Sequence, residues 1–158
     1  MKTDGAVRGA RYVHTNVIAA DWSRLAAFYA EVFGCVAVPP GRDLSGDAFE
    51  RGTGLPGAAL QGIHLRLPGH GVDGPTLEIF QYRPSLERPE TALNRPGLAH
   101  LAFAVADVAQ ARAAVLAAGG HAVGEVVTTR IDACRLVTWC YVTDPEGNVV
   151  ELQAVRTA

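Results

Sequence analysis

The sequence lacks the features that mark several large classes of protein. Lysine occurs only once, at Lys2, and the 158 residues carry a formal net charge of −2, so the chain has no basic stripe of the kind that binds nucleic acid. It has no apolar run long enough to cross a bilayer, and its first residues lack the apolar core of a signal peptide. We therefore expect a cytoplasmic protein that binds neither nucleic acid nor a membrane.

Cysteine is also scarce. The three residues, Cys35, Cys134 and Cys140, are odd in number and form no Cys-x-x-Cys motif, which disfavours a zinc–thiolate site. We expect free, buried thiols in a reducing compartment. The remaining composition, 49% hydrophobic and 19% charged, is ordinary for a soluble globular protein.

What the chain does contain is an internal repeat. His14 stands seven residues before Asp21, and His100 stands seven residues before Asp107. Each histidine lies in a stretch that reads as a β-strand, and each aspartate is placed to cap an alanine-rich helix. This repeat predicts two copies of one structural module.

The second half of each module carries a glutamate. Glu78 follows Gly74 by four residues, Glu151 follows Gly147 by four residues, and both lie inside apolar strands. An unpaired carboxylate in such a strand is costly, so each glutamate should have a compensating partner. Each module therefore offers one His and one Glu.

Hydrophobic periodicity and turn residues predict the order β-α-β-β-β in both modules. The expected fold is α+β, with two βαβββ modules forming a curled mixed sheet in one compact domain. The divisions are a flexible tail (1–10), a first module (11–83), a connector (84–96) and a second module (97–155). Helices are predicted over 22–33 and 108–118, and strands over 11–19, 35–38, 59–67, 75–82, 98–105, 121–128, 134–143 and 148–155. Residues 41–57 are expected to form a long loop with a short strand near 48–51.

Two imidazoles and two carboxylates are a chemically sensible shell for a divalent cation. The candidate ligands are His14, Glu78, His100 and Glu151. Two carboxylates balance the charge of the ion, and four ligands leave two octahedral positions open, as in catalytic metal sites. Nitrogen and oxygen donors without thiolate suit Ni, Co, Zn, Mn or Fe, and the sequence does not choose among them. The alternative is that the duplication kept these residues without a metal.

Strand alternation places two further residues on the same faces as the candidate ligands. Asn16 lies two residues beyond His14, and Phe80 lies two residues beyond Glu78. They are candidate substrate-binding residues, although a plain pocket-lining role explains them more simply. His64 has no partner at matching spacing and is expected to be structural or exposed.

These residues resemble the vicinal oxygen chelate superfamily, which includes glyoxalase I, methylmalonyl-CoA epimerase, extradiol dioxygenases and the bleomycin- and fosfomycin-resistance proteins. The similarity covers roughly residues 11–155. Its landmarks are HTNVIAAD with FYAEVFG, TLEIFQY, GLAHLAFAVADV and DPEGNVVEL. The resemblance implies that the repeated modules enclose a metal and that His14, Glu78, His100 and Glu151 occupy the four ligand positions. It also implies a homodimer.

The ligand set looks most like that of glyoxalase I, because the epimerase usually has Gln where this chain has Glu78. The resemblance then implies a metal-dependent lyase or isomerase that acts through an enediolate on a small-molecule substrate chelating the metal by adjacent oxygens. Glu151 would be the catalytic base, with Glu78 as its symmetric counterpart. Two alternatives stay open: an Fe(II) extradiol-type dioxygenase, which would use only three of the ligands, and a metal-free protein that binds a drug or another small molecule.

Overall fold

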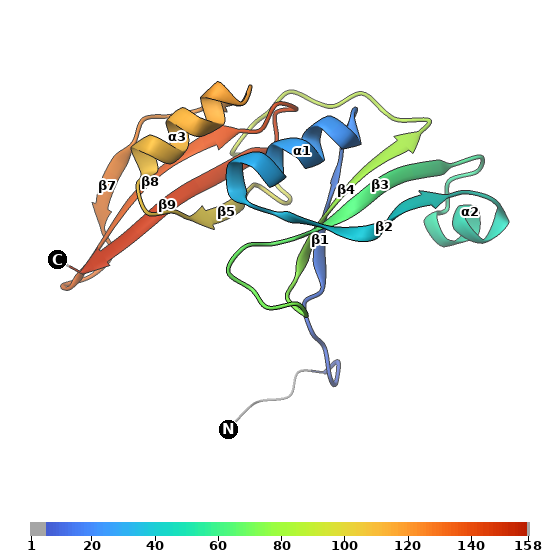
Figure 1. The fold of residues 1–158 in the computed structure, drawn as a ribbon, viewed down its shortest axis with the longest axis horizontal. Helices are drawn as coiled ribbons and strands as arrows, with labels where there is room; N and C mark the ends of the chain where they lie inside the picture. The colour runs from blue at the N-terminus through green and yellow to red at the C-terminus, as the bar shows by residue number, and fades with distance from the viewer. Residues whose placement is uncertain (1–5, 158) are drawn as a thin grey trace. The chain divides into compact units, whose positions relative to one another are not determined.

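The computed structural model describes residues 6–157, and the chain divides into two units, up to Ser85 and from Leu86. Within these residues the chain forms three helices and two mixed sheets, so the predicted α+β class is confirmed (Figure 1). The first half of the predicted tail, residues 1–5, lies outside the described part. No helix between residues 6 and 157 is long and apolar enough to span a membrane.

The first unit has a four-stranded sheet in the order β1-β4-β3-β2. The edge strand β1 runs parallel to β4, and the other pairs are antiparallel. The elements of this unit are β1 (His14–Ile18), α1 (Trp22–Phe33), β2 (Val36–Leu44), α2 (Asp47–Thr53), β3 (Ala59–Arg66) and β4 (Thr76–Arg83). The parallel β1–β4 pair brings the start of the unit beside its last strand.

The second unit repeats this arrangement. Its strands follow the order β5-β9-β8-β6, with β7 also paired to β8, and β5 runs parallel to β9. Its elements are β5 (Leu101–Ala104), α3 (Val108–Ala117), β6 (His121–Ala122), β7 (Val127–Arg130), β8 (Arg135–Thr143) and β9 (Val149–Thr157). The single strand expected over 121–128 is thus two short strands, and β5 is shorter than expected, so His100 immediately precedes it.

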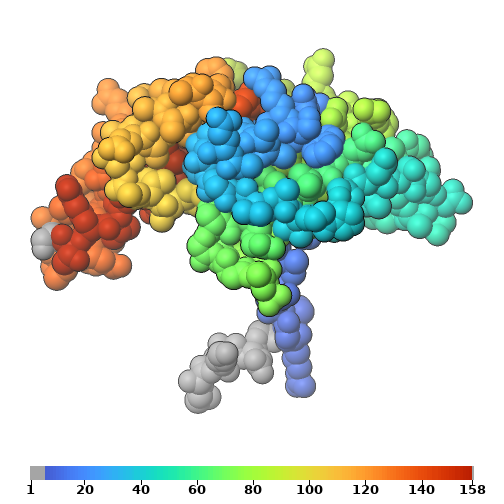
Figure 2. All heavy atoms as spheres, in the orientation of Figure 1, coloured from blue at the N-terminus to red at the C-terminus, as the bar shows by residue number. Residues whose placement is uncertain are grey.

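Helix α1 covers one face of the first sheet. It begins after Asp21, whose carboxylate accepts a hydrogen bond from the Arg24 N–H, and it ends at Gly34 in the left-handed conformation. The heavy atoms of α1, blue in Figure 2, lie over strands of their own unit. Leu25 and Tyr29 on the helix, with Leu77 on β4, are completely buried. The opposite face of this sheet carries two of the candidate ligands, His14 and Glu78.

Helix α3 covers its own sheet in the same way. The Asp107 carboxylate accepts from the Gln110 N–H at the helix start, as the sequence predicts. Val115 of α3 is buried with Val150 and Leu152 of β9. Both helices therefore begin at the aspartates of the repeat.

The Asp107 cap leads to a stability prediction. Replacing Asp107 with alanine leaves the first-turn N–H groups of α3 without a side-chain acceptor, which costs about 1 kcal/mol. Urea unfolding followed by circular dichroism should show a lower midpoint for Asp107→Ala. Asp107→Ser keeps an oxygen acceptor and should remain close to the parent protein, and equal midpoints for all three proteins would contradict the capping role.

The expected loop over 41–57 is not a loop. Residues Asp47–Thr53 form α2, and β2 continues to Leu44 instead of ending at Pro39. The helix is short but suits its sequence, since Asp47 and Glu50 lie near its N-terminus, where acidic groups are favoured. It ends at Gly54 in the left-handed conformation.

Strand β2 tolerates its two prolines because it is the edge strand of its sheet. Pro39 and Pro40 fall within the register shift between Val38 and Arg42, where β3 does not require their missing N–H groups. The sequence rule that proline ends a strand is correct for a central strand. It failed here because sheet position is not encoded locally.

Two of the three thiols are buried, as predicted, whereas Cys134 is exposed. Burial raises the pKa of Cys35 to about 11 and also raises the pKa of Cys140. At pH 8 we therefore expect Ellman's reagent to modify Cys134 rapidly and the other two thiols only after denaturation. Rapid reaction of more than one thiol in the native protein would contradict this burial pattern.

Candidate functional site

The first unit brings His14 and Glu78 together across the parallel β1–β4 pair. Asn16 is the strand neighbour of Glu78, and His14 lies two residues before it on the same face. His14 Nε2 lies 3.3 Å from Glu78 Oε2, and the Asn16 amide donates a hydrogen bond to the same oxygen at 3.2 Å. Glu78 is only 8% exposed, and these contacts provide the compensation that its burial requires.

The second unit brings His100 and Glu151 together in the same way. Ala102 is the strand neighbour of Glu151 on the parallel β5–β9 pair, and His100 lies two residues before it. His100 Nε2 lies 3.0 Å from Glu151 Oε2. The His–Glu pair is therefore duplicated in register as well as in sequence.

His64 is a further candidate residue that the repeat does not reveal. It faces Glu78 across the antiparallel β3–β4 pair. Its Nε2 lies 2.8 Å from Glu78 Oε1, and its Nδ1 lies 3.1 Å from the Thr76 hydroxyl. The available signal was strand alternation, since His64 falls on the same face as Glu78 once β3 and β4 are paired.

The Phe80 ring packs beside His64, in space that is open because Gly62 has no side chain. The two residues are opposite one another on β3 and β4, and a Cβ added at Gly62 would lie 2.5 Å from a ring carbon of Phe80. The Phe80 and His64 rings meet edge to face, with centroids 5.8 Å apart. Phe80 is only 8% exposed, so most of its surface supports the histidine and the sheet.

The position of His64 is occupied by Tyr141 in the second unit. Tyr141 pairs with Glu151 across β8 and β9 as His64 pairs with Glu78 across β3 and β4. The Tyr141 ring lies against His100, with centroids 5.1 Å apart. The two units thus share the His–Glu pair and differ in the residue across from the glutamate.

The surroundings of these two aromatic residues shift their titration. Burial lowers the pKa of the His64 imidazole, and the charges of Arg42 and His14 lower it further, while Glu78 opposes the change. Burial raises the pKa of the Tyr141 hydroxyl, and the Glu151 carboxylate adds to that rise. Both effects favour the neutral side chain.

The two His–Glu pairs have a spacing that suits metal ligands. Metal–nitrogen and metal–oxygen bonds of about 2.0–2.2 Å at about 90° place two donor atoms about 3 Å apart, and the pairs are separated by 3.3 Å and 3.0 Å. Within residues 6–157, no group of three or more His, Cys, Asp and Glu side chains is arranged to hold an ion.

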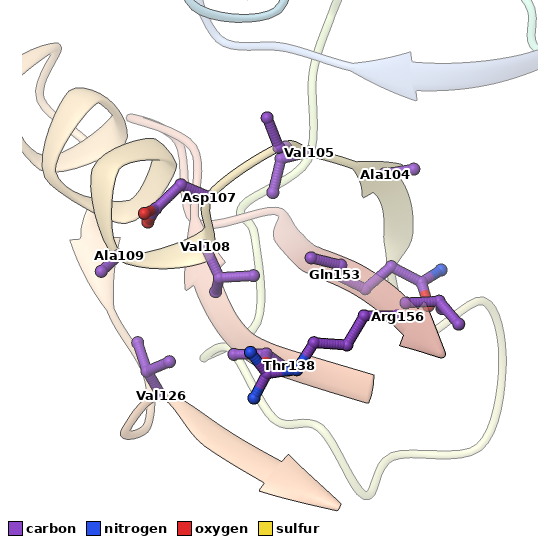
Figure 3. Close-up of a pocket in the computed structure, with 12 residues that line it drawn as sticks. Ala104, Val105, Asp107, Val108, Ala109, Val126, Thr138, Gln153 and Arg156 are labelled. Atoms are coloured by element: carbon purple, nitrogen blue, oxygen red, sulfur yellow. The ribbon is translucent and has the colours of Figure 1, made fainter. Parts of the chain in front are cut away.

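A separate cavity of about 730 Å³ lies in the second unit, around the start of α3 and the outer part of β9. Figure 3 shows Asp107 and Val108 on one side of it, with Thr138, Gln153 and Arg156 on the strands. The candidate ligands and candidate substrate-binding residues do not line it. Gln153 faces the same side of β9 as Glu151, two residues further along the strand.

Comparisons with known proteins place this geometry in context. Residues 13–153 match a sequence family described as a glyoxalase-like domain. A glyoxalase family protein from Bacillus cereus has a similar structure, with a TM-score of 0.71, 22% identity and coverage of 98% of both chains. A glyoxalase/bleomycin resistance protein/dioxygenase family enzyme from Burkholderia phytofirmans has a TM-score of 0.59 at 16% identity, over 92% of this chain and 98% of its own. At these identities the structures establish a common fold, and no curated protein matches the chain.

Proposed function

Because the chain belongs to the glyoxalase-like domain family, we propose that it is a divalent-metal-dependent lyase or isomerase acting on a small substrate with two adjacent oxygens. The observation that carries the proposal is the duplicated pair, His14 with Glu78 and His100 with Glu151, at the same register in both units. The repetition at matched positions gives each unit the same two kinds of ligand, one imidazole and one carboxylate.

The metal ligands in this proposal are His14, Glu78, His100 and Glu151. Their donor set, two imidazoles and two carboxylates, suits Ni, Co, Zn, Mn or Fe. A bound divalent cation would supply Lewis acidity, which lowers the pKa of a substrate C–H next to a carbonyl. The protein would then need a base within reach of that proton.

Glu151 is the better base of the two carboxylates. The Glu78 side chain is 10% exposed and that of Glu151 is 19% exposed. Glu78 also has contacts on both oxygens, from His64 on one and from His14 and Asn16 on the other. Glu151 Oε1 receives no hydrogen bond within the described residues and so can accept a proton. Asn16 and Phe80, which lie beside Glu78, are proposed to contact the substrate.

Elemental analysis tests the metal site directly. Protein purified without a metal-affinity tag should contain near-stoichiometric Ni, Co, Zn, Mn or Fe. The double variant Glu78→Ala/Glu151→Ala should contain almost none. A matched control, Glu87→Ala/Glu90→Ala, removes two exposed carboxylates near the start of the second unit and should keep the metal of the parent protein.

The outcome also ranks the alternatives. Iron, together with oxygen uptake in the presence of a catechol, would favour the extradiol-type dioxygenase. A parent protein that stays metal-free after incubation with each of the five ions would favour a small-molecule binding protein and would overturn the proposal.

A further inference from the structure

In the first unit, the side chains of Thr76, His64 and Glu78 form a hydrogen-bonded chain. The described part of the second unit does not repeat it. The Thr76 hydroxyl lies 3.1 Å from His64 Nδ1, and His64 Nε2 lies 2.8 Å from Glu78 Oε1. A carboxylate only accepts hydrogen bonds, so Nε2 carries the proton and donates it. In the neutral imidazole, Nδ1 is then the acceptor, and the Thr76 hydroxyl donates to it.

This chain divides the two oxygens of Glu78 between different partners. Oε1 is held by His64, whereas Oε2 faces His14 Nε2 at 3.3 Å and accepts from Asn16. The oxygen beside His14 is the one placed to share an ion with that histidine. Holding Oε1 fixes the carboxylate plane and therefore the direction in which Oε2 points.

The His64 ring is itself held in place. Its side chain is only 17% exposed, and its edge-to-face contact with Phe80 restricts rotation of the ring. The Phe80 ring lies over Gly62, where any side chain would occupy its position. The orientation of His64 is thus set by a hydrogen bond on one side and by packing on the other.

We propose that His64, oriented by Thr76, is a positioning residue that fixes Glu78 as a metal ligand. This inference rests on the proposed function, because it assigns the role toward the metal site. Groups that hydrogen-bond to a ligating carboxylate or imidazole raise metal affinity by orienting the ligand before the ion arrives. His64 acts through Glu78 and is not itself a ligand.

Between residues 86 and 157, the second unit has no equivalent series of hydrogen bonds. Tyr141 stands across from Glu151, and Ala102 replaces the amide of Asn16. Within the described residues, the Glu151 carboxylate makes its hydrogen-bonding or ionic contact with His100. Only Glu78 is therefore oriented by hydrogen bonds of this kind, so the inference applies to one of the two glutamates.

Metal titration of the parent protein and four variants tests the role of His64. Cobalt(II) is added to the metal-free parent, His64→Ala, His64→Gln and Thr76→Val proteins, and binding is followed by the visible absorption of the ion. We expect His64→Ala to weaken binding about 10- to 100-fold. Thr76→Val should weaken it less, and His64→Gln, whose amide can still donate to Glu78, should recover part of the loss. His121→Ala removes an exposed histidine of the second unit and should bind as the parent does.

A second measurement separates this inference from the proposed function. Nitrogen NMR shifts of the metal-free protein report which imidazole nitrogen of His64 carries the proton. We expect the Nε2–H tautomer in the parent protein. In Thr76→Val, which lacks the hydroxyl that donates to Nδ1, we expect a mixture of the two tautomers. If the parent binds no cobalt, the metal function fails while the tautomer still tests the chain. Parent-like cobalt affinity in His64→Ala, or an Nδ1–H tautomer in the parent, would overturn the positioning role.

Discussion

Replacement of Glu151 by glutamine is expected to abolish most proton transfer while the protein stays folded. A general base typically contributes about 10²- to 10⁴-fold to a rate, and the glutamine amide cannot accept a proton at neutral pH. The oxygen that loses this capacity, Oε1, receives no hydrogen bond within the described residues, so the substitution disturbs few existing interactions. The folded structure should be retained.

Deuterium exchange measures this loss without knowledge of the natural substrate. Dihydroxyacetone has a carbonyl and a hydroxyl oxygen on adjacent carbons, and its C–H protons exchange with D₂O when a base removes them. NMR should show faster exchange with the metal-loaded parent than in buffer, and a 10²- to 10⁴-fold smaller acceleration with Glu151→Gln. The control Glu125→Gln changes an exposed glutamate of the same unit and should leave the acceleration intact. Equal acceleration by all three proteins would remove Glu151 from the role of base.

The largest loss of stability is expected from Gly62→Ala. An added Cβ would overlap the Ile79 carbonyl oxygen and lie 2.5 Å from a ring carbon of Phe80. Ile79 is completely buried in the centre of the first sheet, so its backbone cannot move without separating β3 from β4. Overpacking of this kind costs about 1–3 kcal/mol and sometimes more, and a clash with backbone places this variant at or above the upper end.

Urea unfolding checks the Gly62 prediction. The midpoint for Gly62→Ala should fall well below that of the parent protein. Gly124→Ala provides the matched control, because an added Cβ there meets nothing within 4 Å, and its midpoint should stay close to the parent value. A Gly62→Ala protein as stable as the control would show that β3 and β4 can separate locally at little cost.

The elements of the repeat were predictable because their signals are local. Asp21 and Asp107 cap the two helices at the expected positions, and the alternation along 75–82 correctly separates Glu78 from the buried Leu77 and Ile79. The repeat also identifies the histidine and the glutamate of each module, although the parallel strand pairs that bring them together, β1–β4 and β5–β9, are known only from the structure.

The remaining features depend on neighbours that the sequence does not specify. His64 was set aside because nothing at matching spacing occurs in the second module, where Tyr141 takes its place. Its role becomes visible only when the register of β3 on β4 is known. Likewise β2 passes through Pro39 and Pro40 because it is an edge strand, and strand order is set by the whole sheet.

The difference between His64 and Tyr141 has an evolutionary consequence. Two separate copies of a half-size module, related by a two-fold axis, would be forced to carry the same residue at both positions. Fusion of the copies into one gene product removes that constraint, because each half then mutates independently. One glutamate could then gain the hydrogen bond from His64, while the other kept an oxygen without a hydrogen bond. A single ancestral carboxylate could in this way give rise to two with separate roles.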